Sequence, residues 1–337
     1  MSKLTIREIA KMAGVSPTAV SFVINNKDGV SEETRRIVNE VIQRTNFKPN
    51  VNSRRLFFKK SFNISIVIKQ TSSPFNDLFY FEIAKGLLEK SKEYGYNIVF
   101  TDISIEKNEV ILPDIIELKD TDGIIFLQDT EKAILNEVNR HNIPYVIIDA
   151  HTMISDCTCI NADYELSSYV ATKYLIDNGH RDIGYIGASY IQDFYLQSFT
   201  GFKNALAESN LSIQPAWLQV KAIDEDTSYA CMEVILNNPS IPTAIFCPAD
   251  LFAIGAARCA KQRGFKIPED ISFVSIDDIL LSRYFEPKLT TIKIDKEKMG
   301  RLAMELIVRK IDGEDVDSIV IESDNLVVRD SVSNRKK

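Results

Sequence analysis

The apolar positions between residues 5 and 24 recur every three or four residues, which is the period of an amphipathic helix. The pattern breaks at Gly14, so it predicts two short helices joined by a tight turn. A third helix is expected from Ser31 to about Thr45. The apolar residues with which the three helices are expected to face one another are Ile6, Ile9, Ala10, Ala13, Val20, Val23, Ile24, Ile37, Val38, Val41 and Ile42.

The ends of the two short helices carry residues that helix termini favour. Thr5 and Glu8 have the spacing of a capping box, in which each side chain accepts a hydrogen bond from the other residue's backbone N–H. Gly14 suits the turn because a left-handed backbone costs glycine little. Ser16 is expected to cap the second helix, and Pro17 at its first position lacks only an N–H that would otherwise be unpaired.

Two short helices with a supporting third helix form a helix-turn-helix, whose second helix enters the major groove of DNA. Phe47-Lys-Pro-Asn50 then provides a stop and turn signal. The basic segment 51–60 is too short to be stable as an isolated helix. It is either a solvated linker or a hinge that folds on DNA, with Arg54 and Arg55 near phosphates and Leu56 as a minor-groove wedge.

From Phe62 onward, short and nearly continuous apolar runs alternate with helical segments. This alternation is typical of a parallel sheet covered by helices on both faces. It repeats in two halves divided near residues 160–163, and a cleft between such halves can close on a small polar ligand. The expected strands are 64–68, 97–100, 123–127, 145–148, 183–186, 217–220, 244–247, 272–276, 319–321 and 326–329, and the expected helices are 79–94, 110–117, 131–141, 165–178, 199–209, 227–237, 251–263 and 296–311.

Charge is distributed unevenly along the 337 residues. The whole chain has a net charge of −7, but the first 60 residues hold twelve Lys or Arg and five Asp or Glu, a net +7, which leaves −14 for the remainder. A basic head on an acidic body suits a DNA-binding domain joined to a domain that does not adhere to DNA. The length predicts two or three domains, and a hydrophobic content of 45% predicts a globular protein.

Cysteine usage and hydropathy predict a cytoplasmic protein that does not engage a membrane. The chain shows no apolar run long enough for a membrane helix and no apolar segment near Met1. Cys157 and Cys159 have the spacing of half a metal site, but no second pair or neighbouring histidine completes it. We expect reduced and mostly buried thiols at all five cysteines, Cys157, Cys159, Cys231, Cys247 and Cys259.

The sequence contains little that would support catalysis. It has three histidines, His141, His151 and His180, and it lacks a serine nucleophile elbow, a phosphate-binding loop and a metal-spaced cluster. We therefore expect neither an enzyme nor a bound cofactor or metal.

Further segments accompany residues 5–25 in a fixed order. They are Val30-Ser-Glu-Glu-Thr-Arg35, Phe47-Lys-Pro-Asn50 with Arg54 and Leu56, Gly179-His-Arg181, Gly201-Phe-Lys-Asn-Ala-Leu206, Pro242-Thr-Ala244, Ile267-Pro-Glu-Asp-Ile271, Ile276-Asp-Asp-Ile279 and Pro287-Lys-Leu-Thr-Thr291. In this order and spacing they resemble the lactose-repressor (LacI/GalR) family of bacterial transcription regulators over essentially the whole chain.

The resemblance implies an all-α helix-turn-helix head and an α/β body of two doubly wound parallel-sheet subdomains of periplasmic-binding-protein type. It implies a sequence-specific repressor, a homodimer on a near-palindromic operator in double-stranded DNA, with a small sugar or sugar-phosphate effector in the cleft. No leucine heptads follow Arg329, so a dimer is expected rather than a tetramer. The expected domains are a head of residues 1–49, a hinge of 50–61, one subdomain of 62–162 plus 293–323, and a second of 163–292 plus 324–337.

The resemblance also implies which residues contact DNA. Pro17 and Thr18 occupy positions that usually read bases, and only Thr18 has a hydrogen-bonding side chain. Phe22 stands where the family usually has an arginine, so it either contacts a thymine methyl group or packs against its own domain or the hinge. The complete set of expected DNA contacts is Thr5, Ser16, Pro17, Thr18, Ser21, Phe22, Asn25, Asn50, Ser53, Arg54 and Leu56.

The expected effector site departs from the family at two positions. Ser198 replaces an arginine that clamps the effector in many members, and Ala249 stands where an asparagine is common. The resemblance places effector contacts at Phe79, Tyr80, Asp149, Ser198, Asp250 and Asp277. Each has a structural alternative: Phe79 suits the core, Asp149 a turn, Asp250 and Asp277 helix caps. A ligand role is favoured most clearly for Asp277.

Two other functions compete with an effector-operated regulator. A solute-binding transport protein shares the two-lobed body, but the basic head argues against it. Some relatives that govern carbon use bind a phosphorylated carrier protein, and the missing arginine at Ser198 makes such a protein partner a further alternative.

Overall fold

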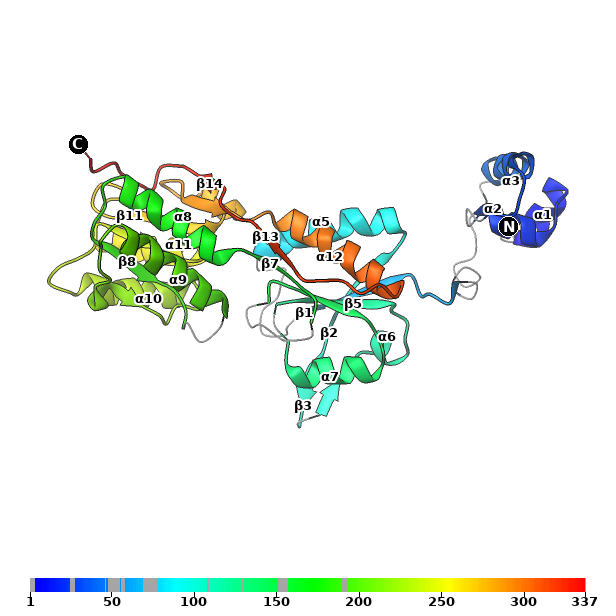
Figure 1. Cartoon of the computed structure of the whole chain (residues 1–337), viewed down its shortest axis with the longest axis horizontal. Helices are drawn as coiled ribbons and strands as arrows, with labels where there is room; N and C mark the ends of the chain where they lie inside the picture. The colour runs from blue at the N-terminus through cyan, green and yellow to red at the C-terminus, as the bar shows by residue number, and fades with distance from the viewer. Residues whose placement is uncertain are drawn as a thin grey trace. The chain divides into compact units, whose positions relative to one another are not determined.

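The computed structural model describes residues 4–24, 28–45, 47, 55, 58–68, 78–107, 109–128, 130–150, 157–189 and 193–336. The chain folds as two compact units, Met1–Phe62 and Asn63–Lys337, which we call the head and the body (Figure 1).

The head consists of three helices around one small apolar core. They are α1 (Ile6–Ala13), α2 (Pro17–Ile24) and α3 (Glu32–Thr45). The predicted first turn is confirmed, because the Thr5 and Glu8 side chains form the complete capping box. Gly14 has a φ of 67° at the left-handed end of α1. The buried core residues are Ile9, Ala10, Ala13, Val20, Val23, Val38, Val41 and Phe47.

The body contains two sheets, and we call the sheet that begins at residue 63, with its helices, lobe 1. Its strand order is β13-β7-β6-β5-β1-β2, and every pair is parallel. A small antiparallel hairpin of β3 and β4 extends from it. The elements are β1 (Asn63–Ile68), α5 (Leu78–Tyr94), β2 (Asn97–Asp102), β3 (Ser104–Glu106), β4 (Glu109–Ile111), α6 (Asp114–Glu117), β5 (Gly123–Leu127), α7 (Lys132–Arg140), β6 (Tyr145–Ile148), β7 (Cys159–Ala162), α12 (Lys296–Ile311) and β13 (Ile319–Ile321).

Lobe 2 repeats this architecture with the strand order β14-β12-β11-β10-β8-β9. Its pairs are parallel except for β14, which runs antiparallel to β12. Helices cover both faces of the sheet (Figure 1). The elements are α8 (Tyr164–Asp177), β8 (Ile183–Ile186), α9 (Asp193–Glu208), η1 (Pro215–Trp217), β9 (Leu218–Gln219), α10 (Glu225–Leu236), β10 (Ala244–Phe246), α11 (Asp250–Gln262), β11 (Ser272–Asp277), η2 (Leu280–Arg283), β12 (Thr290–Lys293) and β14 (Leu326–Val327).

The chain passes between the lobes three times. It leaves lobe 1 between β7 and α8, returns between β12 and α12, and leaves again between β13 and β14. Each lobe is therefore built from segments far apart in sequence. This arrangement allows the lobes to shift against each other while each keeps its own core.

Helices α5 and α12 of lobe 1 cross with almost no space between their backbones. A Cβ atom added to Gly86 would lie 2.0 Å from the Glu297 carbonyl oxygen, and one added to Gly300 would lie 2.2 Å from the Ile83 carbonyl oxygen. Glycine at both positions is therefore required by the close approach. Because the two backbones interlock, we expect α5 and α12 to move as one body.

The predicted β/α alternation in two halves is confirmed, and several predicted segments match in detail. Strands β5, β6, β8 and β13 and helix α12 have the predicted bounds. The helix predicted over 110–117 is wrong in its first half, because residues 109–111 pair with β3 and α6 begins only after Pro113. The β-branched pair Val110 and Ile111, followed by Leu112 directly before Pro113, favours a strand here. The strand predicted at 217–220 is reduced to β9, since residues 215–217 form the 3₁₀ turn η1.

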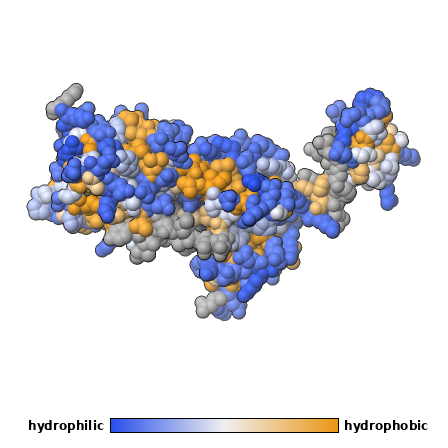
Figure 2. Space-filling model, in the orientation of Figure 1, coloured by the Kyte–Doolittle hydropathy of each residue, from blue (hydrophilic) through white to orange (hydrophobic). Residues whose placement is uncertain are grey.

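The surface of the body is mainly hydrophilic, with hydrophobic residues gathered near α5 and α12 in the view of Figure 2. Across the residues that the structure describes, no helix has both the length and the hydropathy needed to span a membrane.

Candidate DNA-reading head and effector cleft

Helix α2 exposes the residues that were predicted to read DNA. Pro17 and Thr18 are exposed, and Ser21 is half-buried on the same helix. The Ser16 hydroxyl accepts a hydrogen bond of 3.1 Å from the backbone N–H of Ala19, so the predicted cap is confirmed. The first turn of α2 is thus fixed while its outer face is open to a partner.

Phe22 packs against its own domain. Its ring lies 3.2 Å from the position that a Cβ atom on Gly29 would occupy, so a larger side chain at residue 29 would require the ring to shift by a few tenths of an ångström. Of the two roles considered for Phe22, this contact supports packing. A DNA contact by Phe22 stays a prediction.

Of the other predicted DNA contacts, Thr5 is already hydrogen-bonded within the head, and the rest lie outside the described residues. The Thr5 N–H and hydroxyl donate to the Glu8 carboxylate at 2.7 and 2.9 Å, and these hydrogen bonds, the backbone one first, lower the pKa of Glu8. The predicted contacts that lie outside the described residues are Asn25, Asn50, Ser53, Arg54 and Leu56.

Two strand ends of the body place aspartates in strained backbone conformations. Asp149 directly follows β6 of lobe 1 with a φ of 59°, and Asp277 ends β11 of lobe 2 with a φ of 119°. Asp278 is also left-handed, at 51°. Non-glycine residues of this kind cost free energy and concentrate at functional sites. Ligands of open parallel sheets bind at these carboxyl ends.

Asp149 joins the two lobes. Its buried carboxylate accepts a hydrogen bond of 2.7 Å from the Tyr80 hydroxyl, which lies on α5 of lobe 1. It accepts another, of 2.5 Å, from the Tyr164 hydroxyl at the first position of α8 in lobe 2. This carboxylate therefore accepts hydrogen bonds from phenols of both lobes.

Tyr195 and Asp277 belong to the same neighbourhood. Burial first, then the charges of Asp149 and Asp277, raises the pKa of Tyr164 well above its usual value. The same three causes raise the pKa of Tyr195 to about 12. The Phe194 ring meets the Tyr164 ring edge-on, with centroids 4.3 Å apart. Protonated phenols beside carboxylates can donate and accept hydrogen bonds, as a polyhydroxyl ligand requires.

On the lobe 1 side, Phe79 and Tyr80 of α5 lie next to these residues. Both are buried, and their rings meet edge-on with centroids 5.2 Å apart. The Lys296 ammonium lies 5.7 Å from the Phe79 ring centroid. It also donates to the backbone carbonyl of Asp277, so it places a cation beside the Phe79 ring and the end of β11.

The Asp250 carboxylate is surrounded by hydrogen-bond donors of lobe 2. Asp250 is fully buried, and its carboxylate accepts hydrogen bonds from the hydroxyls of Ser275, Ser282 and Thr291 at 2.5–2.6 Å and from the Ile279 N–H at 2.8 Å. Burial raises its pKa, and these hydrogen bonds oppose the rise. With four donors already bound, Asp250 organises the loop after β11, and its predicted effector contact is not part of the set we propose below.

Ser198 is likewise enclosed. It is fully buried, and its hydroxyl donates 2.9 Å to the Phe194 carbonyl one turn earlier in α9. The serine therefore supports the turn that carries Phe194 and Tyr195. Any role of Ser198 towards the effector stays a prediction.

Sequence reasoning missed four residues that lie around Asp149 and Asp277: Tyr164, Phe194, Tyr195 and Lys296. One signal was available, because Lys296 begins a helix, where the positive end of the helix dipole disfavours a cation. The tyrosines gave no signal of this kind, since aromatic residues on a helix are more often core residues.

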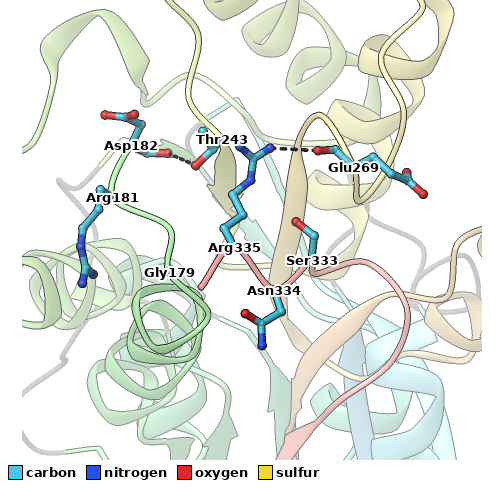
Figure 3. A pocket seen from close by; sticks show the side chains of 8 residues that line it. All are labelled: Gly179, Arg181, Asp182, Thr243, Glu269, Ser333, Asn334 and Arg335. Atoms are coloured by element: carbon cyan, nitrogen blue, oxygen red, sulfur yellow. Dashed lines mark hydrogen bonds between the residues drawn. The ribbon is translucent and has the colours of Figure 1, made fainter. Parts of the chain in front are cut away.

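Lobe 2 has a separate hollow at the opposite edge of its sheet (Figure 3). The C-terminal segment forms one side of it, where the Arg335 guanidinium donates to the Glu269 and Asp270 carbonyls at 2.9 and 3.0 Å. These contacts anchor the end of the chain. The residues around the hollow are Gly179, Arg181, Asp182, Thr243, Glu269, Ser333, Asn334 and Arg335.

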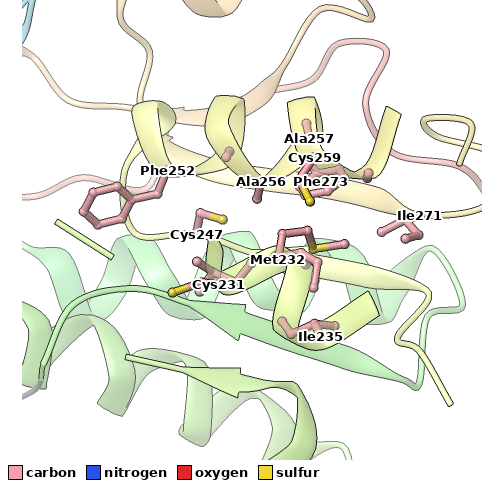
Figure 4. Close-up of a cluster of buried hydrophobic side chains, with 14 of the residues drawn as sticks. Cys231, Met232, Ile235, Cys247, Phe252, Ala256, Ala257, Cys259, Ile271 and Phe273 are labelled. Carbon is pink, nitrogen blue, oxygen red and sulfur yellow. The ribbon is translucent and has the colours of Figure 1, made fainter. Parts of the chain in front are cut away.

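All five cysteines are free thiols, as predicted, and four of them are buried. Cys231, Cys247 and Cys259 lie in the apolar core between α10, α11 and the lobe 2 sheet (Figure 4). Burial raises the pKa of each of these three thiols, which disfavours the thiolate form. Within the described part of the chain, no group of three or more His, Cys, Asp or Glu side chains is placed to hold a metal ion.

Comparison with known structures locates the fold. The complex of the transcriptional regulator CelR with cellobiose has a TM-score of 0.69 and 25% sequence identity, covering 97% of this chain and 99% of CelR. The lac repressor dimer bound to operator and the anti-inducer ONPF has a TM-score of 0.73 and 21% identity, covering 98% and 100%. The second match shows the fold alone.

Sequence comparison identifies the family. The model of bacterial regulatory proteins, lacI family, matches residues 5–50, and that of the periplasmic binding protein-like domain matches 172–332. The HTH-type transcriptional repressor PurR of Pasteurella multocida is 33% identical over 336 residues, 98% of this chain and 99% of PurR. Its counterpart in Vibrio campbellii is 32% identical over 333 residues, 97% and 98%. The chain therefore belongs to the lacI family of bacterial transcriptional regulators.

Proposed function

We propose that this lacI-family repressor binds operator DNA through its head and that a small, sugar-like effector in the cleft of the body sets its operator affinity. The observation that carries the proposal is the shared carboxylate of Asp149, which accepts hydrogen bonds from Tyr80 of lobe 1 and Tyr164 of lobe 2. A ligand that competes for this carboxylate acts on both lobes at once, which couples its binding to their relative arrangement.

The proposed effector contacts combine aromatic faces with hydrogen-bonding groups. Such a mixture suits a ring that carries hydroxyl groups, because the apolar faces stack on the ring and the polar groups orient it. Cellobiose in the CelR complex is a ligand of this class. The proposed set keeps four predicted residues, Phe79, Tyr80, Asp149 and Asp277, and adds Tyr164 and Tyr195.

In the head, we propose that the exposed turn of α2 enters the major groove, with Thr18 as the hydrogen-bonding reader. Phosphate contacts by the basic residues supply affinity that falls steeply with salt. The relatives are transcriptional repressors, which supports a chain that acts on DNA in the cytoplasm and has no catalytic function.

A dimer matches the two half-sites of a palindromic operator. Its proposed surface includes apolar side chains that lobe 2 exposes on η2 and directly after it, at Leu280, Leu281 and Tyr284. On lobe 1, Phe81 and Leu88 of α5 are also exposed. Exposed apolar groups of this kind are covered in an oligomer.

The DNA function is tested by selecting binding sites from random DNA with the full-length chain at physiological salt. A palindromic consensus is expected, and the absence of any preferred sequence contradicts the proposal. Binding to that consensus is expected to weaken by orders of magnitude, roughly 10³-fold or more, between 50 and 200 mM salt.

The effector function is tested by calorimetric titration of the full-length chain with a panel of neutral sugars and sugar phosphates. Asp277→Asn is expected to lower the response of operator binding to the ligand that binds, while operator affinity without ligand survives. An unchanged response excludes Asp277 from the site. If no panel member binds at millimolar concentration, control by a protein partner on the body becomes the favoured function.

A further inference from the structure

We infer that Lys296 transmits effector binding from lobe 2 to lobe 1, an assignment that rests on the effector cleft proposed above. Lys296 is the first residue of α12 and is 1% exposed. A buried ammonium at a helix N-terminus is unfavourable on two counts, desolvation and the positive end of the helix dipole. Its neighbours must therefore compensate for its charge.

The compensating groups come from both lobes. The ammonium donates to the backbone carbonyl of Asp277 and, at 3.3 Å, to that of Asp278, both at the end of β11 in lobe 2. On the lobe 1 side it lies 3.5 Å from the Glu82 carboxylate of α5. Lys296 thus links the strand end that carries Asp277 to the helix that carries Phe79 and Tyr80.

The lobe 2 end of this link is a strained segment. Asp277 and Asp278 are consecutive left-handed residues, and their two carbonyl oxygens meet the one ammonium. The Asp278 carboxylate is held separately by the guanidiniums of Arg329 and Arg283 within lobe 2. Lys296 therefore helps to hold the main chain at Asp277, together with the pairing of β11 with β12 and the hydrogen bond from the Asp278 N–H to the Thr291 hydroxyl. Strain of this kind persists only where surrounding contacts enforce it.

The lobe 1 end of the link is rigid. Helices α5 and α12 interlock at Gly86 and Gly300, so a force on Lys296 acts on both helices together. A ligand that binds the side chain of Asp277 shifts the backbone carbonyl to which the Lys296 ammonium donates. The displacement then reaches α5 through Lys296 and Glu82. Lys296 acts here as a positioning residue, since no contact with the effector is required of it.

Amide hydrogen exchange of the full-length chain without effector separates this role from a merely local stabilising one. In Lys296→Met, which keeps the volume and removes the charge, exchange is expected to speed up about tenfold both in residues 276–280 and in residues 79–84. Lys298→Met is the matched control, because Lys298 is exposed in the same turn of α12. It should leave both segments unchanged.

Glu82→Gln tests the lobe 1 contact of Lys296 separately from its lobe 2 contacts. It removes the ionic partner on α5 and keeps the carbonyl contacts, so exchange should rise in residues 79–84 and stay at the wild-type rate in residues 276–280. Faster exchange in only one segment of Lys296→Met, or in neither, overturns the inference. Global loss of protection throughout Lys296→Met also overturns it, because the lysine would then be a general core residue.

Operator binding gives the functional readout. Lys296→Met is expected to change the operator dissociation constant by about threefold or more, and Lys298→Met to leave it unchanged. An unchanged constant in Lys296→Met overturns transmission, even if exchange is altered. Failure of the wild-type chain to bind any operator contradicts the proposed function instead, and the exchange result then still decides whether Lys296 links the lobes.

Discussion

The hydroxyl of Tyr164, at the start of lobe 2, donates a 2.5 Å hydrogen bond to the carboxylate of Asp149, at the end of a lobe 1 strand. Both side chains are buried. Hydrogen bonds to a charged group are stronger than neutral ones, so this contact contributes to the arrangement of the lobes without ligand. An effector that competes for the same oxygen of Asp149 would displace Tyr164.

Tyr164→Phe removes this hydrogen bond and keeps the ring against Phe194. The free energy of unfolding, measured with urea, is expected to fall by about 1.5–3 kcal/mol. Effector affinity is expected to change as well, because the lobes lose a contact that the ligand must compete with. Tyr174→Phe on the same helix is the control. An equal loss of stability there would show that the hydrogen bond to Asp149 contributes no more than any other tyrosine hydroxyl of α8.

Much of the body was predictable because its signals are local. Apolar runs of strand length, glycines after helices and capping residues all act within a few positions, and strand β5 and helix α12 appear with the predicted bounds. Strands β7 and β12 were missed because their residues are mixed in polarity. In β12, Thr290 and Thr291 are fully buried, and the Thr291 hydroxyl donates to the Asp250 carboxylate, a partner that no local pattern reveals.

The candidate effector site was predictable only in part, because most of its contacts join residues that are far apart in the sequence. The ends of strands indicated Asp149 and Asp277, since parallel strands present their carboxyl ends to ligands. The partners of these residues come from distant segments: Tyr80 from α5, Tyr164 from α8 and Lys296 from α12. Only the folded chain brings them together, and only there does Asp250 prove to be enclosed by hydroxyl groups.

Asp250→Asn is expected to damage folding. The amide brings two N–H donors into a site where four donors already point at the carboxylate, so at least one donor loses its partner. An unpaired buried group of this kind costs about 1–3 kcal/mol of unfolding free energy, and more where a charge was involved. Ser198→Ala, which removes a single buried hydroxyl, should cost less. A fully stable Asp250→Asn with impaired effector binding would restore Asp250 to the ligand site.

The dimer surface can be tested at Tyr284, whose side chain is 77% exposed beside Leu280 and Leu281. Tyr284→Asp is expected to raise the dimer dissociation constant, measured by analytical ultracentrifugation, by tenfold or more, since about 1.4 kcal/mol of apolar contact suffices for that change. Leu118→Asp alters a residue of lobe 1 that is 75% exposed and should leave the dimer intact. Equal effects of both changes would argue against this surface.

Leu56→Ala tests the hinge, which lies outside the described residues, so the prediction comes from the sequence. If Leu56 is a minor-groove wedge, the variant loses specific operator affinity by about tenfold or more, and binding to random DNA changes little. Effector binding to the body should be unaffected. A variant that loses effector affinity as well would show that Leu56 supports the body rather than the DNA contact.

His180 makes stability depend on pH. Its ring is buried, with Nε2 3.2 Å from the Ser333 carbonyl and Nδ1 2.9 Å from the Thr243 hydroxyl, and burial lowers its pKa from the usual 6.5 to about 4. Between these values the unfolded chain binds a proton that the folded chain does not. The free energy of unfolding should therefore fall as pH decreases from 6.5 to 4, by up to about 1.4 kcal/mol per pH unit.

His180→Gln isolates this contribution, because glutamine has no proton to take up. The variant is expected to be less stable at pH 7.5, where neutral His180 has both partners. Its urea midpoint should then decline less than that of the wild type as pH falls from 6.5 to 4, so the two curves converge. Parallel curves over this range would mean that His180 is protonated equally in the folded and unfolded chain, and that its burial does not govern its charge.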